Sequence, residues 1–214
     1  MSSGMTSLSI ALDPAAAASV DPGLVEFVRA NMRLAPVPAL PGISLYVAHP
    51  GSGLRRLSRR AGPPYWAYPW AGGAALARHF LDRPETVAGR RVLDLGAGSG
   101  IVGIAAAKAG ARHVTAAEID RNGHAALALN AAANGVAIAV TGDDLLAGPP
   151  PAVDLVAVGD LFYERRLARR VTPFLDRCIA AGVEVLVGDP GRAYLPTARL
   201  RILAEYRVAD VGEA

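Results

Sequence analysis

The chain has 214 residues, of which 52% are hydrophobic and 19% charged, with a formal net charge of +3. This composition excludes a wholly disordered chain, and 23 glycines and 16 prolines without a repeat exclude a collagen-like one. The first 91 residues carry 10 arginines against 5 acidic residues, and the remainder carries 12 basic against 14 acidic residues. Any basic partner surface is therefore expected early in a chain that has the length of one sizeable domain.

Cysteine and histidine usage argues against a metal site. Cys178 is the only cysteine, and the four histidines lack metal-ligand spacing. No run of about 18 apolar residues predicts a membrane span, and no basic start predicts a secretory signal. We therefore expect a soluble, cytoplasmic protein that binds no metal and no membrane.

Residues 1–69 are expected to form an N-terminal arm and extension ahead of the main domain at 70–214. Residues 1–20 show no clear period, whereas Asp21 and Pro22 predict the start of a helix at about 21–34. Prolines end this helix, and residues 43–48 alternate like a short strand. A basic loop follows at 51–62, with arginines at Arg55, Arg56, Arg59 and Arg60.

From residue 70 onwards, predicted helices and strands alternate. Helices are expected at 70–81, 101–109, 122–134 and 164–180, and strands at 91–95, 113–118, 136–141, 153–159 and 183–188. Residues 203–211 can supply one further strand but not the antiparallel pair that usually closes such a sheet, so the expectation is either a sheet of six strands or a truncated chain. This alternation predicts an α/β, Rossmann-like, doubly wound and mostly parallel sheet, with its ligand beyond the carboxyl ends of the strands.

The first of these strands ends in a glycine-rich loop. Asp94 precedes Gly96, Ala97, Gly98 and Gly100, so the spacing is G-x-G-x-G, and Ile101 stands where a G-x-G-x-x-G dinucleotide fingerprint needs its third glycine. An acid at this point suits a ligand that presents a cation, such as the amino group of a methionyl moiety. The alternative is a glycine turn that serves only helix packing.

Two more carboxylates follow the next strands. Glu118 lies roughly 20 residues past the glycines, where an acidic side chain accepts hydrogen bonds from ribose hydroxyls. The alternative is that Asp120 takes this role, although Asp120 is also the expected cap of the next helix. Asp143 could meet an adenine amino group or simply belong to a surface turn.

Over residues 70–208 the sequence resembles the class I, seven-stranded S-adenosylmethionine-dependent methyltransferases, whose first motif looks like residues 94–100. The resemblance implies S-adenosylmethionine as cofactor and S-adenosylhomocysteine as product. It also implies that the glycine loop, Glu118 and a side chain near Asp143 hold the cofactor.

The fourth strand ends in Gly159, Asp160, Leu161, Phe162 and Tyr163, where the methyl acceptor is expected. This Asp-x-x-Tyr pattern lacks the prolines of base-modifying enzymes and resembles class I enzymes that methylate protein lysines. Asp160 would bind and align the amine, and Tyr163 would hydrogen-bond it or bound its pocket. Gly159 is assigned to the cofactor site and Phe162 to the substrate site. The alternative is that Asp160 only caps the helix that begins near Glu164.

An aromatic segment at 63–73 precedes the main fold. In the lysine methyltransferases that this sequence resembles, a tryptophan before the glycine loop lies against the cofactor, and Trp70 matches it. Core packing alone remains the alternative for Trp70, and equally for Trp66.

The most specific resemblance is to the electron-transfer flavoprotein β-subunit lysine methyltransferases, and it includes the run Gly188-Asp189-Pro190-Gly191-Arg192. It implies lysine methylation of the electron-transfer flavoprotein β subunit, with ribosomal stalk protein as a further acceptor and no nucleic-acid partner. Arg192 could bind an acidic part of the protein substrate, or Asp189 and Arg192 could pair to fix the loop.

Three function hypotheses follow. The first is a protein-lysine N-methyltransferase, the second a small-molecule N-methyltransferase of the nicotinamide type, and the third a non-catalytic interaction module. The arginine cluster at Arg165, Arg166, Arg169 and Arg170 makes two like-charge i,i+4 pairs, which is more typical of a solvated helix face than of a docking site.

Overall fold

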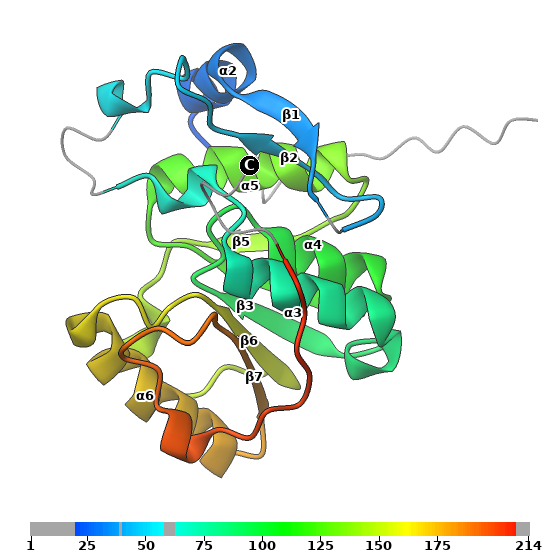
Figure 1. Cartoon of the computed structure of the whole chain (residues 1–214), viewed down its shortest axis with the longest axis vertical. Helices are drawn as coiled ribbons and strands as arrows, with labels where there is room; N and C mark the ends of the chain where they lie inside the picture. The colour runs from blue at the N-terminus through cyan, green and yellow to red at the C-terminus, as the bar shows by residue number, and fades with distance from the viewer. Residues whose placement is uncertain (1–19, 39, 58–62, 209–214) are drawn as a thin grey trace, which may run out of the picture.

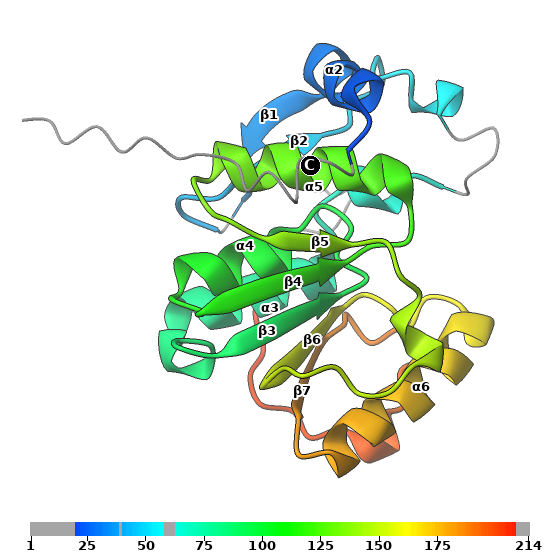
Figure 2. The same ribbon diagram turned by 180° about the vertical axis from the view of Figure 1, so that it is seen from behind.

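The computed structural model describes residues 20–38, 40–57 and 63–208 (Figure 1). Its centre is a five-stranded sheet of β3 (Arg91–Leu95), β4 (His113–Ala117), β5 (Ala139–Thr141), β6 (Leu155–Gly159) and β7 (Glu184–Gly188). The strand order is β5-β4-β3-β6-β7 and every pairing is parallel (Figure 2). The predicted α/β, Rossmann-like fold class is therefore confirmed.

The chain reverses its direction across the sheet between β3 and β6. It runs outward through β4 and β5 and then returns to place β6 on the other side of β3. Such a switch point leaves a crevice beyond the carboxyl ends of the two central strands. The segments that follow β3 and β6 therefore face the same crevice, as the sequence analysis expected.

Four helices pack around the sheet: α3 (Ala71–Asp82) precedes β3, and α4 (Ile101–Lys108), α5 (Arg121–Ala133) and α6 (Arg165–Ala180) follow β3, β4 and β6. Alternate strand residues divide between two cores. Val92 and Leu155 belong to the core under α3 and α4, whereas Leu93 and Val156 belong to the core under α6. Because strand side chains alternate with a period of two, both faces of the sheet are covered and its strands are almost wholly apolar.

Two backbone segments approach each other closely where α3 begins. A Cβ atom built on Gly72 would lie 2.2 Å from the carbonyl oxygen of Gly188, and one built on Gly159 would lie 2.9 Å from the Cα of Gly73. The absence of side chains at these positions lets the first turn of α3 rest directly on the ends of β6 and β7. Gly72 and Gly73 therefore allow α3 to pack against the strand ends that carry the site.

The N-terminal extension packs on α5. It comprises α2 (Pro22–Asn31) and an antiparallel pair of strands, β1 (Arg33–Pro36) and β2 (Ser44–Val47). Val28 and Met32 form a small core with Trp66 and with apolar residues of α5. The helix and β2 lie close to the predicted positions, whereas β1 was not predicted, because Pro36 and the prolines after it indicated a break. Pro36 is tolerated there at the end of an edge strand.

Short 3-10 turns join these elements: η1 (Leu54–Arg56), η2 (Tyr65–Ala67), η3 (Pro84–Thr86), η4 (Leu145–Ala147) and η5 (Thr197–Arg199). The predicted arm at 1–20 lies outside the described residues except for its last position, and the part of the basic loop at 58–62 lies outside them as well. Among the described residues, no helix is long and apolar enough to cross a membrane.

The expected sixth strand is wrong over residues 203–208, which form no strand; positions 209–211 lie outside the described residues. This segment contacts α3 through side chains instead. The Tyr206 hydroxyl lies 3.0 Å from Nδ1 of His79, and Val208 packs against the core under α3. The segment runs across the front of the molecule near α3 (Figure 1). It gains tertiary contacts without adding hydrogen bonds to the ladder of β7.

Candidate functional site

A cavity of about 970 Å³ opens beyond the carboxyl ends of β3 and β6. Its lining includes most of the predicted site: Trp70, Asp94, Gly96, Ala97, Gly98, Glu118, Asp143, Gly159, Asp160, Tyr163 and Arg192. Gly100, Phe162 and Asp189 do not line it. The volume lies in the upper part of the range of small-molecule sites.

The glycine loop between β3 and α4 has a backbone that most residues would not adopt. Gly96, Gly98 and Gly100 have φ angles of +70°, +53° and +78°. A Cβ atom on Gly96 would also lie 2.5 Å from the side chain of Leu161. The loop can therefore turn tightly into α4 and leave its bare backbone facing the cavity.

Asp94 lies beneath this loop and is almost completely buried, at 1% exposure. Its Oδ2 accepts a hydrogen bond of 2.9 Å from the N–H of Gly103 in α4. Burial raises the pKa of Asp94 from 3.8 to about 7, against the opposing effect of that hydrogen bond. A cationic ligand group in the cavity would favour the charged form of this carboxyl.

Glu118 follows β4 and also lines the cavity. Its two carboxylate oxygens accept hydrogen bonds of 2.8 Å from the N–H groups of Gly98 and Asp120. Burial raises its pKa, while these two hydrogen bonds oppose the rise. Asp120 caps α5, as predicted, through the N–H of Asn122, and its other oxygen accepts from the indole of Trp66. Both oxygens of Asp120 are therefore engaged within the protein.

Asp160 lies at the end of β6, on the other side of the switch point. Its φ of +59° makes it the only non-glycine residue with a positive φ among the described residues. Oδ2 accepts a hydrogen bond of 2.6 Å from the N–H of Gly73, and Oδ1 accepts one from Arg192. Strained, buried polar residues of this kind cluster at functional sites. The alternative role is excluded, because Glu164 and not Asp160 stands at the N-cap of α6.

Burial raises the pKa of Asp160, whereas the Gly73 N–H and the Arg192 guanidinium oppose the rise. Arg192 also lies 3.9 Å from Asp189, whose Oδ1 accepts from the N–H groups of Gly191 and Arg192. The Oδ2 of Asp189 is buried without a hydrogen-bond partner among the described residues. The predicted pairing of Asp189 with Arg192 is thus present at longer range, but the closer partner of Arg192 is Asp160.

Aromatic rings line the side of the cavity next to Asp160. The ring of Tyr65 lies 4.9 Å from that of Tyr163 and 5.9 Å from that of Trp70, between ring centres. The indole of Trp70 donates a 2.7 Å hydrogen bond to the carbonyl of Tyr65. Tyr65 and Tyr163 each remain 40% exposed, so the side of the cavity that they bound is accessible to solvent. No role in the site was predicted for Tyr65.

The structure separates two of the predicted site residues: Asp143 lines the cavity, whereas Phe162 does not. Phe162 is fully buried in the core under α6, so it packs within the domain instead of facing a substrate. It shares its turn with Tyr163, but the two rings point into different surroundings. Asp143 does line the cavity, and its Oδ2 accepts a 2.8 Å hydrogen bond from the Thr141 hydroxyl. The described residues contain no cluster of three metal-binding side chains.

Asn130, which was not predicted from the sequence, binds the backbone of the glycine loop. Asn130 of α5 is fully buried and donates a 2.8 Å hydrogen bond to the carbonyl of Ser99. Its carbonyl oxygen accepts 2.7 Å from the N–H of Tyr46 in β2. One amide thereby links the extension, α5 and the loop, and the only sequence signal for it is a polar residue inside an apolar helix.

The sheet topology, the glycine loop and the carboxylates at the end of β3 and after β4 match the pattern predicted for a class I methyltransferase fold. A family model described as ribosomal protein L11 methyltransferase (PrmA) matches residues 75–156. The chain is also similar to electron transfer flavoprotein beta subunit lysine methyltransferases. The Danio rerio protein is 41% identical over 153 residues, which cover 69% of this chain and 59% of that protein.

The Xenopus laevis protein of the same name is 41% identical over 155 residues, covering 70% of this chain and 63% of its own length. Among solved structures, ribosomal protein L11 methylase from Lactobacillus delbrueckii subsp. bulgaricus is 31% identical with a TM-score of 0.46, and the match covers 55% of this chain and 60% of that one. The predicted resemblance is confirmed by the two curated relatives. The chain spans about 60% of their length.

Proposed function

We propose that this domain transfers a methyl group from S-adenosylmethionine to a lysine side chain of a protein, and that the acceptor is the electron transfer flavoprotein β subunit. The observation that carries the proposal is the buried Asp160 carboxylate, which faces a cavity shared with the glycine loop and bounded by exposed tyrosines. The names of the relatives at 41% identity support the choice of acceptor.

The donor groups of the cavity suit S-adenosylmethionine. Asp94 and the backbone of Gly96 to Gly98 would hold the cationic methionyl end, and Glu118 would accept from the ribose hydroxyls. Asp143 and the apolar Leu145 and Leu146 line the part of the cavity where an adenine would fit. When bound, the cofactor supplies a methyl group on a positively charged sulfur.

The acceptor amine must be neutral to react. At an ordinary lysine pKa of about 10.4, loss of the proton costs about 4.6 kcal/mol at pH 7. Asp160 would not lower this cost, because a nearby carboxylate favours the charged amine. Its role is to capture the ammonium and fix its position, which the Gly73 N–H and Arg192 make possible by immobilising the carboxylate.

The exposed tyrosines complete the acceptor site. The faces of Tyr65 and Tyr163 attract a cation through their quadrupoles, and their apolar surface removes water from the incoming amine, which favours the neutral form. Their 40% exposure leaves room for a side chain that projects from a macromolecule. This accessibility supports a protein acceptor over a small molecule of the nicotinamide type.

The test is methyl transfer from labelled S-adenosylmethionine to recombinant electron transfer flavoprotein β subunit, and in parallel to a cell lysate. We expect label on lysine residues of the purified acceptor. Label confined to small metabolites would contradict the lysine proposal, and label on a different protein would contradict the choice of acceptor.

The variant Asp160→Asn tests the site itself. Asparagine tolerates the positive φ and still accepts from the Gly73 N–H, so the fold should persist. Methyl transfer should fall by at least about 100-fold while calorimetry shows unchanged cofactor affinity. Asp176→Asn on the exposed part of α6 is the matched control. Unchanged turnover in Asp160→Asn would contradict the role of Asp160 and favour a non-catalytic module or another acceptor site.

A further inference from the structure

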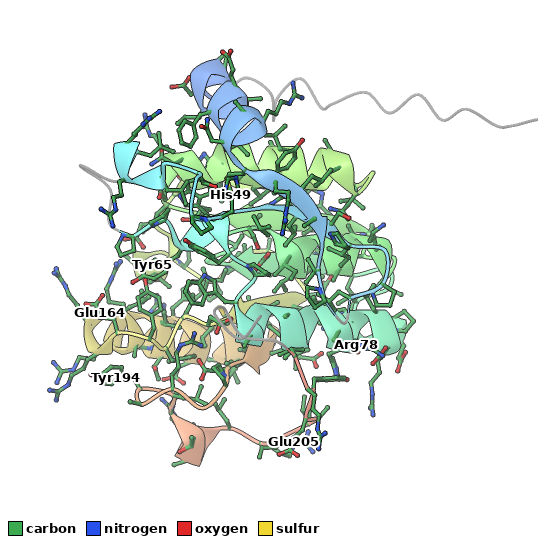
Figure 3. The ribbon with its side chains drawn as sticks, turned by 45° about the horizontal axis from the view of Figure 1, so that its top comes forward. His49, Tyr65, Arg78, Glu164, Tyr194 and Glu205 are labelled. Carbon is green, nitrogen blue, oxygen red and sulfur yellow. The ribbon has the colours of Figure 1, made fainter. Side chains whose placement is uncertain are left out.

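A second, shallower groove of about 530 Å³ adjoins the cavity at the N-terminal end of α6. It is lined by Tyr163, Glu164, Arg165, Arg166, Arg169, Arg170 and Tyr194, which we call the arginine groove. Tyr163 and Arg170 line both the arginine groove and the cavity. Figure 3 shows Glu164 and Tyr194 on the same side of the molecule as Tyr65. The groove therefore begins where the acceptor site ends.

The arginines of this groove are unfavourable for the helix that carries them. Arg165 and Arg169, like Arg166 and Arg170, are like charges at i,i+4, and all four lie in the first two turns. The N-terminal end of a helix carries partial positive charge and favours acids, yet the first turn of α6 contains none. Local stability does not explain why four arginines gather here.

Three of these charges lack an acidic partner within the described chain. Arg170 is paired with Asp144 at 2.6 Å, whereas Arg165, Arg166 and Arg169 are exposed and form no ion pair with the described residues. Glu164 is the only acidic side chain that lines the groove. The groove thus presents an uncompensated positive surface beside an acceptor site whose key group is a carboxylate.

We propose that the arginine groove binds an acidic segment of the acceptor protein, next to the lysine that enters the cavity. This inference rests on the proposed function and adds to it the charge pattern of the substrate. In a segment where acidic residues flank the lysine, the lysine ammonium would lie at Asp160. The carboxylates of the flanking residues would then contact Arg165, Arg166 and Arg169. The first six residues of α6 extend about 9 Å, enough for two or three carboxylates of an extended peptide.

The charge pattern favours a peptide over a nucleic acid. The cavity that continues from the groove is lined by six carboxylates, Asp94, Glu118, Asp120, Asp143, Asp144 and Asp160, and by three arginines. A polynucleotide would extend its phosphates towards this acidic lining, whereas a lysine with acidic neighbours matches both surfaces. Charge complementarity of this kind steers association and fixes register.

The first experiment compares two double variants with the same change in charge. The variant Arg165→Glu/Arg169→Glu reverses the charge of two residues of the groove. The control variant, Arg29→Glu/Arg33→Glu, makes the same change on α2 and β1, at the opposite end of the molecule from α6 (Figure 1). Glutamate near the start of α6 favours the helix, so the groove variant should fold. A melting temperature and an S-adenosylhomocysteine affinity close to those of the wild type would show that the variant folds.

Initial rates are then measured against the concentration of electron transfer flavoprotein β subunit. We expect the groove variant to raise KM at least tenfold with kcat within about twofold, and the control variant to change neither. The KM of the wild-type protein should also rise with salt. Equal KM values for the two variants would overturn the inference, although wild-type transfer would still support the proposed function.

A binding measurement keeps the inference testable without turnover. The probe is a fluorescein-labelled peptide in which one lysine lies between two Asp-Glu pairs, with S-adenosylhomocysteine present. We expect anisotropy to report binding by the wild type and the control variant, and its loss in the groove variant. Equal binding of the peptide by the wild type and the groove variant would overturn the inference. So would tighter, arginine-dependent binding of an oligouridylate with four phosphates, which would assign the groove to nucleic acid.

Discussion

Arg192, from the loop after β7, donates a hydrogen bond to Asp160 at the end of the neighbouring strand β6. The guanidinium has a second carboxylate, that of Asp189, 3.9 Å away. Asp160 is thereby held between the first turn of α3, through the Gly73 N–H, and the loop that carries Arg192. The run after β7, for which a substrate contact and an internal Asp189–Arg192 pair were both predicted as alternatives, thus contacts the carboxylate that we propose captures the amine.

Replacing Arg192 by glutamine should change the pH dependence of methyl transfer. Arg192 opposes the rise in the pKa of Asp160 that burial causes, so its removal should raise that pKa further. Capture of the amine requires the ionised carboxylate, so the acidic limb of the profile of kcat/KM should move to higher pH, with at least a tenfold loss at pH 7. Rates measured between pH 5.5 and 9 give this profile.

The conservative variant Arg192→Lys serves as the control for this change. Lysine keeps the positive charge beside Asp160 but not the planar fork, so the acidic limb should return towards its wild-type position while part of the activity stays lost. A glutamine variant whose pH profile coincides with that of the wild type would contradict the coupling of Arg192 to Asp160.

Asp94 should make both stability and cofactor affinity depend on pH. Its pKa is raised by burial from 3.8 to about 7 in the folded chain, so its contribution to stability is complete below pH 3.8 and is lost as pH rises through about 7. Without cofactor, the melting temperature of the wild type should therefore fall between pH 5.5 and 8. Asp94→Asn should remove most of this fall.

Cofactor binding should show the opposite trend, because the ionised Asp94 attracts a cationic ligand. S-adenosylmethionine affinity by calorimetry should increase as pH rises through about 7 in the wild type and stay nearly constant in Asp94→Asn. Asp154→Asn, at the other end of the sheet, is the control for a general effect of pH. A wild-type affinity that is flat across this range would argue against contact between Asp94 and the cation.

The parts of this site that could be predicted are those written in consecutive residues. Asp94 to Gly100 and Gly159 to Tyr163 each begin at the end of a buried strand, and parallel strands bring their carboxyl ends to one edge. The Asp160–Arg192 pair spans 32 residues and depends on the order of β6 and β7, which alternation of helices and strands does not specify. Phe162 and Tyr163 share a motif, yet only the packing of α6 determines that Phe162 faces the core.

The prediction of a sixth strand was wrong because it, too, depended on tertiary contacts. Residues 203–208 alternate well enough for a strand, but a strand needs a partner, and this segment found side-chain contacts with α3 at His79 instead. In the extension, β1 was not predicted because proline generally argues against a strand. Pro36 is nevertheless tolerated in β1, which is an edge strand. Both differences arise from tertiary contacts that override local preference.

Gly72→Ala should destabilise the domain severely. The added Cβ would lie 2.2 Å from the carbonyl oxygen of Gly188, and neither backbone segment can move without displacing α3 or the sheet. We expect a loss of at least about 3 kcal/mol in the free energy of unfolding, measured by urea titration. Gly148→Ala, where the nearest atom is 3.5 Å away, should change it by less than about 0.5 kcal/mol. Equal effects at the two glycines would contradict the close approach.

Asn130→Leu should weaken both the fold and cofactor binding, although Asn130 does not line the cavity. Leucine has a similar volume but leaves the carbonyl of Ser99 and the N–H of Tyr46 without this partner, and each unsatisfied buried group costs about 1–3 kcal/mol. The carbonyl of Ser99 belongs to the glycine loop, so calorimetry should show at least a tenfold loss of S-adenosylmethionine affinity. Asn31→Leu, at the C-terminal end of α2, should leave that affinity unchanged. Because the amide of Asn130 connects β2 to the loop, a loss of stability without any loss of affinity would show that the extension supports the fold but does not position the site.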